Sequence, residues 1–106
     1  MENHTLIEIA FSVYDVPAAE AFKSGASGEH SNIPRARQLA FKLLTEYNKC
    51  TAKNIGELFN ISSFTVSASI TCLNNNINRI YVSQRILPVI NKYREAVSII
   101  MNCKEK

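Results

Sequence analysis

Residues 52–73, AKNIGELFNISSFTVSASITCL, contain the most informative pattern in the chain. Gly56, Asn60 and Val66 follow one another at the spacing with which two short helices cross steeply and pack. Gly56 has no side chain and so lets the second helix approach the first. Asn60 tolerates the left-handed conformation in which a helix ends and the chain turns. This stretch therefore predicts two short helices joined by a tight turn.

The second of these helices has two distinct faces. Either Ser62 or Ser63 offers a hydroxyl that can cap its first turn. Its apolar residues recur at helical spacing and form one inward stripe: Val66, Ile70, Leu73 and Ile77. The opposite face carries small polar groups of a size that suits a groove of DNA: Ser63, Ser67, Thr71 and Asn74. The pattern indicates a helix-turn-helix, with an ordinary tight pair of core helices as the alternative.

The composition of the 106 residues is that of one ordinary globular domain, which we expect to span residues 1–106. Hydrophobic residues make up 46% and charged residues 20%, and there are three Gly and three Pro. Because alternating, strand-like runs are few, we predict an all-α fold of about six helices. The formal net charge of +3 and the pI near 8.9 permit nucleic-acid binding without demanding it.

The remaining segments complete the predicted bundle. Apolar periodicity predicts helices over residues 3–14, 17–22, 33–48 and 83–102. The Gly/Ser-rich stretch 24–32 is the expected loop, and Thr51 is the expected N-cap of the first motif helix. Since Pro88 lies inside the pattern of the closing helix, that helix either begins near Leu87 or bends at the proline.

The sequence offers little to metal, cofactor or membrane chemistry. Cys50, Cys72 and Cys103 are far apart and form no CxxC pair, so we expect small buried apolar residues in a reducing cytosol rather than metal ligands or disulfides. No apolar run approaches membrane-spanning length, and the acidic start is not that of a signal peptide. We therefore expect a cytoplasmic protein with no cofactor and no membrane partner. Without a catalytic Ser/His/Asp set, a carboxylate pair or a phosphate loop, we predict that it is not an enzyme.

Two further motifs carry a resemblance to a known family. The long helix opens with Pro34-Arg35-Ala36-Arg37-Gln38-Leu39-Ala40, and Ile55-Gly56-Glu57-Leu58-Phe59 precedes the turn. From about Leu6 to Val97 the chain resembles the C-terminal DNA-binding domain (domain IV) of the bacterial replication initiator DnaA. The resemblance implies a Trp-repressor/DnaA-like helix-turn-helix bundle. It also implies that Arg35 enters a minor groove, while Arg37 and Gln38 join it at the backbone or base edges.

The chain departs from the family in the turn and the second helix. Family members follow the Phe with Gly-Gly-Arg-Asp-His-Thr-Thr-Val, whose Asp, His and Thr contact bases. Here residues 60–66 are one residue shorter and keep only Thr65-Val66. The family's Lys/Arg-rich loop is replaced by residues 24–32, and a Walker-type phosphate loop is missing. The initiator's origin specificity therefore does not carry over, and the initiator-like tail of some repeat-element transposases is the closer analogue.

DNA affinity would come mainly from phosphate contacts and specificity from base edges. The candidate phosphate partners are cations near the motif and the long helix: Lys23, Arg35, Arg37, Lys42, Lys49 and Lys53. The candidates for the major groove are hydroxyl residues: Ser62, Ser63, Ser67, Thr71 and, by match to the family, Thr65. Hydroxyls discriminate bases poorly, so we expect weak intrinsic specificity. Phe64 either contacts a thymine methyl group or staples the turn to the core, and the staple is favoured.

Two functions follow from these observations. The first is binding of double-stranded DNA in replication initiation or its regulation, either as a homodimer or within a larger replication or transposition assembly. The alternative is a protein-interaction module of the same fold that has lost sequence-specific DNA binding, because the family's base-contacting residues are missing.

Overall fold

The computed structural model describes residues 2–22, 32–78, 84 and 86–104, and these residues form helices without any strand. The elements are a 3-10 helix, η1, and five α-helices, in the order α1 (Asn3–Val13), η1 (Ala18–Phe22), α2 (Ile33–Asn48), α3 (Ala52–Phe59), α4 (Ser63–Ile77) and α5 (Leu87–Lys104). The predicted all-α fold is confirmed. No helix among the described residues combines the length and the apolar character that crossing a bilayer requires.

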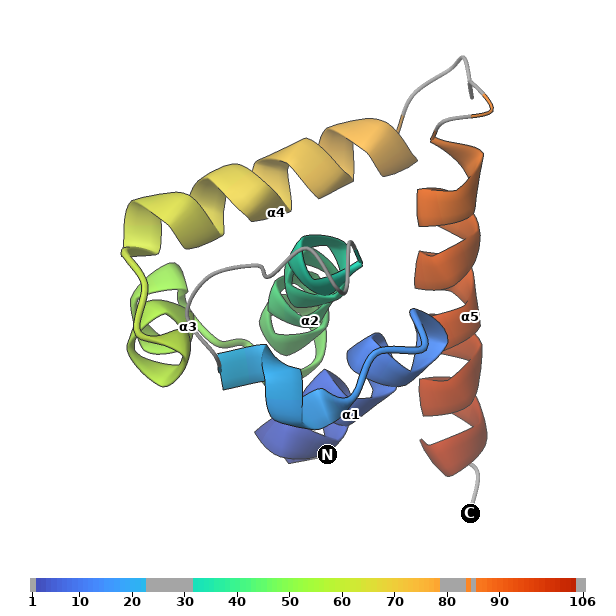
Figure 1. The fold of residues 1–106 in the computed structure, drawn as a ribbon, viewed down its shortest axis with the longest axis horizontal. Coiled ribbons are helices and arrows are strands. Elements are labelled where there is room, and N and C mark those ends of the chain that lie inside the picture. The colour runs from blue at the N-terminus through green and yellow to red at the C-terminus, as the bar shows by residue number, and fades with distance from the viewer. Residues whose placement is uncertain (1, 23–31, 79–83, 85, 105–106) are drawn as a thin grey trace.

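Helix α2 lies at the centre of the bundle (Figure 1). α1 packs along one side of it, α4 crosses its other side, and α5 runs along the edge of both α1 and α4. The core between these helices consists of side chains that are almost inaccessible to solvent, among them Leu6, Phe11, Leu39, Leu43, Leu44, Ile55 and Val66. The rings of Phe41 and Phe59 meet edge to face at 5.0 Å and join α3 to the core. Both helices of the motif, α3 and α4, therefore pack against α2.

The turn between α3 and α4 has the geometry that the sequence predicts. Asn60 is left-handed, with φ 57° and ψ 47°, and Ile61 N–H donates to the Gly56 carbonyl at 2.9 Å. A Cβ atom on Gly56 would lie 2.7 Å from the Ile61 oxygen and 3.3 Å from the Ser63 nitrogen, so this close approach requires glycine. The predicted pair of helices joined by a tight turn is confirmed.

Side-chain hydroxyls cap both helices of the motif. Thr51 Oγ1 accepts from Asn54 N–H at 3.1 Å, and Ser62 Oγ accepts from Thr65 N–H at 3.1 Å. The predicted cap at Thr51 is confirmed, and of the two serines considered for α4 it is Ser62 that caps. Each cap satisfies a backbone donor that the helix itself cannot pair.

Two expected boundaries change at the outer parts of the chain. The closing helix, expected over 83–102, reaches Lys104 and begins at Leu87, so the alternative of a start near Leu87 is confirmed. Pro88 is its second residue, where the missing N–H would have no helical partner in any case. Residue 83 lies outside the described residues, as does the expected loop over 24–32 except for Asn32, whose side-chain amide donates to the Tyr14 carbonyl.

Candidate nucleic-acid interface

The hydroxyl residues of the predicted major-groove face are exposed. Val66 and Leu73 are buried at 0% and 2% exposure, whereas the residues on the other side of α4 face solvent: Ser62, Ser63, Thr65, Ser67 and Thr71. The predicted inward stripe is thus buried at Val66 and Leu73 and half-buried at Ile70 and Ile77. This arrangement leaves one full side of α4 available to a partner.

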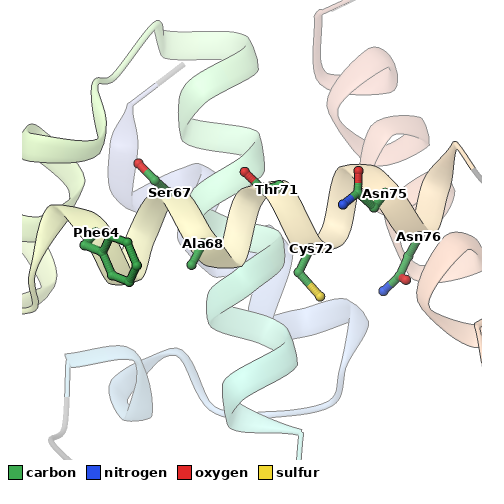
Figure 2. A pocket seen from close by; sticks show the side chains of 7 residues that line it. All are labelled: Phe64, Ser67, Ala68, Thr71, Cys72, Asn75 and Asn76. Carbon is green, nitrogen blue, oxygen red and sulfur yellow. The ribbon is translucent and has the colours of Figure 1, made fainter.

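The hydroxyls of Ser62 and Thr65, at the start of α4, form hydrogen bonds within the fold. Ser62 Oγ caps the helix and lies 2.8 Å from Thr65 Oγ1, so these two side chains bond to each other. Ser63, Ser67 and Thr71 therefore remain the more suitable hydroxyls for contact with base edges. Figure 2 shows Ser67 and Thr71 on one side of α4, and Ala68, Cys72 and Asn76 on the side where α2 begins.

Of the predicted cationic partners, Arg35, Lys49 and Lys53 are exposed. Lys49 terminates α2 in the left-handed conformation, with φ 56°. Lys53 lies in the first turn of α3, so these two lysines flank the start of the motif. Lys23 lies outside the described residues.

Arg37 and Gln38 have contacts inside the fold that the sequence did not predict. Arg37 is half-buried, and its Nε donates to the Ala21 carbonyl of η1 at 3.0 Å. Gln38 is also half-buried, and its Nε2 donates to the Ser69 carbonyl of α4 at 2.9 Å. Both side chains thus position helices relative to one another, and their contact with DNA stays a prediction.

Lys42 belongs to a polar cluster that joins α2, α4 and α5. Its Nζ pairs with the Glu46 carboxylate and with Asn74 Oδ1, and it lies 5.1 Å from the centre of the Tyr93 ring. Tyr93 in turn donates to Glu46 Oε2 at 2.9 Å. Burial and this hydrogen bond raise the pKa of Tyr93 far above its usual 10.0. Lys42 is therefore engaged internally, which does not fit its expected role as a phosphate partner.

The bonds of Gln38 and Lys42 also locate Arg35. Residues 35, 38 and 42 lie on one stripe of α2, because seven residues at about 100° each return to within about 20° of the same direction. Since Gln38 and Lys42 both contact α4, Arg35 continues this stripe about 4.5 Å beyond Gln38, toward the start of α2. Its positive charge also opposes the rise that burial produces in the pKa of Tyr14. Arg35 is exposed in the first turn of α2.

The exposed face of α4 carries no charge and is partly apolar. None of residues 63–77 is charged. Phe64 is 80% exposed, so the favoured hypothesis that it staples the turn to the core is wrong. Cys72 and Cys103 are exposed and Cys50 is half-buried, which also corrects the expectation of three buried cysteines. A shallow groove of about 530 Å³ runs along this face and is lined by Phe64, Ser67, Ala68, Thr71, Cys72, Asn75 and Asn76 (Figure 2).

Comparison with known proteins adds no relative to these observations. A scan against models of protein families finds no match, and a search of curated proteins finds no significant one. The resemblance to the initiator domain therefore stays a prediction from the motifs. Within the described part of the chain, no group of His, Cys, Asp and Glu side chains is arranged to hold a metal ion.

Proposed function

We propose that this chain binds double-stranded DNA, with α4 in the major groove and Arg35 at the adjacent backbone or minor groove. The observation that carries the proposal is the solvent-exposed face of α4, which lies opposite the buried side chains of Val66 and Leu73. Helix-turn-helix proteins place their second helix in the major groove and contact bases from its first turns. A role in replication initiation or its regulation rests on the resemblance alone, and a cytoplasmic location rests on the sequence features described above.

The binding energy would come from cations outside α4. Arg35, Lys49 and Lys53 are the exposed members of the predicted phosphate set. Three phosphate contacts predict that log K falls with log salt concentration with a slope of about −2.7. Raising the salt from about 50 to about 200 mM should then weaken binding about 40-fold. This slope is modest, as the low net charge of +3 leads one to expect.

A salt titration of binding to random-sequence duplex tests this function. Arg35→Ala combined with Lys53→Ala should reduce the slope from about −2.7 to about −0.9, because two phosphate contacts are lost. The charge-matched control is Arg94→Ala with Lys104→Ala on α5, which lowers the net charge equally, from +3 to +1. The control should keep the wild-type slope. Equal slopes for the two double variants would reject the assigned binding face.

A second function is favoured by the lack of charge on α4. A neutral helix face with an exposed Phe64 also suits contact with another protein. The same titration distinguishes the two functions, since an interaction module shows no salt-dependent affinity for random duplex at low ionic strength. That result would make the interaction module the better account.

A further inference from the structure

Phe64 is the most exposed large apolar side chain among the described residues. It is the second residue of α4, at 80% exposure, while buried side chains such as Val66 occupy the opposite face of the same turn. Ala68 and Cys72 follow it at intervals of four residues and are also exposed. These three side chains form an apolar row along the groove on α4 (Figure 2).

The first turns of α4 offer few polar groups to a base. Residues 63–73 contain no Arg, Lys, Asn, Gln, Asp or Glu, so the side chains that bind bases in a bidentate manner are missing there. Asn74, Asn75 and Asn76 come only in the last turns of the helix. What the first turns present is therefore hydroxyls and apolar surface.

The major groove has one apolar base-edge group, the C5-methyl group of thymine, and cytosine acquires an equivalent group when it is methylated at C5. Phe64 and Ala68 are both residue types that contact this methyl group. They lie about 6 Å apart along the helix axis, which is close to two base steps of about 3.4 Å. The row can therefore cover pyrimidine methyl groups that are one or two steps apart.

We propose that Phe64, together with Ala68, contacts pyrimidine C5-methyl groups in the major groove, so that the chain prefers thymine-containing duplex. This inference rests on the proposed DNA binding and names the base feature that it selects. Hydroxyls bond with several bases and discriminate poorly between them. The preference for one base over another therefore comes from the apolar contacts of Phe64 and Ala68. Burial of one methyl group on binding lowers the dissociation constant about fourfold.

The test uses two duplexes of the same sequence, one with thymidine and one with deoxyuridine at the same positions, so that they differ only in the C5-methyl groups. The affinity of the full chain for each duplex is measured by fluorescence anisotropy at low salt. The wild type should bind the thymine duplex about fourfold more tightly for each methyl group contacted. A second pair, cytosine against 5-methylcytosine, should favour the methylated duplex. In Phe64→Ala both ratios should fall about fourfold, because the contact of Phe64 is lost and that of Ala68 remains. Met101→Ala is the matched control, because Met101 is also an exposed apolar residue, at 51% exposure, but lies near the end of α5.

The outcomes separate the inference from the function on which it rests. Salt-dependent binding with equal affinity for thymine and deoxyuridine would overturn the inference and leave DNA binding intact. The absence of salt-dependent binding to any duplex would reject both. A methyl preference in Phe64→Ala as large as that of the wild type would overturn the assignment to this residue. Sedimentation that shows a dimer lost in Phe64→Ala would mean that Phe64 contacts a second copy of the chain instead.

Discussion

The substitution Gly56→Ala tests whether the close approach of α3 and α4 shapes the motif. Alanine in place of glycine inside a helix normally stabilises by about 1 kcal/mol. Here the new Cβ would lie 2.7 Å from the Ile61 oxygen, whereas ordinary van der Waals contact begins at 3.4 Å. The turn would have to move by the difference, about 0.7 Å. Because both neighbours of the Cβ are backbone atoms, which cannot rotate away, we take the upper end of the usual overpacking cost, about 3 kcal/mol.

The net effect of Gly56→Ala is thus a loss of about 2 kcal/mol in the free energy of unfolding. For a domain of this length the melting temperature should fall by about 9 °C. Urea and thermal unfolding followed by far-ultraviolet circular dichroism measure both quantities. Glu57→Ala is the control, because this exposed neighbour on α3 should change stability by less than about 0.5 kcal/mol. If Gly56→Ala is as stable as the wild type or more so, the close approach does not constrain the turn.

Three further predictions concern single side chains. Ser62→Ala should lower the free energy of unfolding by about 1 kcal/mol in urea denaturation, because Thr65 N–H loses its acceptor, and an unchanged midpoint would contradict the cap. Burial and the bond to Glu46 raise the pKa of Tyr93 above 10.0, so its contribution to stability is present below pH 10.0 and is lost as the pH rises further. Tyr93→Phe should therefore lose stability less steeply than the wild type in unfolding titrations above that pH, and parallel curves would refute the coupling. Cys72 should react in the native state with a thiol reagent faster than half-buried Cys50, and Cys72→Ser should remove one fast phase.

The turn was predictable from the sequence because its determinants are local. Asn60, Ser62 and Thr51 act on backbone groups within a few residues of themselves, so their type and spacing suffice. Gly56 similarly marks a close contact with a segment only five residues away. Such features require no knowledge of the rest of the fold.

The side chains on the surface of α4 were harder to assign. A hydrophobic staple joins the residue before the cap to the fourth residue of the helix. Ile61 and Val66 occupy these two positions and both pack against the core, so Phe64 has no place in a staple. Cys72 follows the inward stripe closely in sequence, but it is rotated by about 100° from its neighbour Leu73 and faces outward.

The contacts of α2 depend on which helix crosses it, and no local pattern reveals this. Arg37, Gln38 and Lys42 look alike in sequence as polar residues of an amphipathic helix. Arg37 contacts η1, 16 residues away, and Gln38 and Lys42 contact α4, 31 and 32 residues away, so helical periodicity does not reveal these bonds. The pair of Lys42 with Glu46 is different, because it joins residues four apart within α2. Arg35, in the first turn of the same helix, is exposed.

In the proposed complex with DNA, affinity and base preference come from different helices. The exposed cations Arg35 and Lys53 lie on α2 and α3, whereas Phe64 lies on a helix without any charge. Arg35→Ala with Lys53→Ala should therefore flatten the salt dependence equally for thymine and deoxyuridine duplexes, leaving their affinity ratio unchanged. Phe64→Ala should lower the ratio about fourfold while keeping the wild-type salt slope. Because phosphates and base methyl groups are separate partners, the triple variant should show the sum of the two effects within about 0.5 kcal/mol. A Phe64→Ala variant whose salt slope falls as far as that of the double variant would mean that α4 does not lie in the groove as proposed.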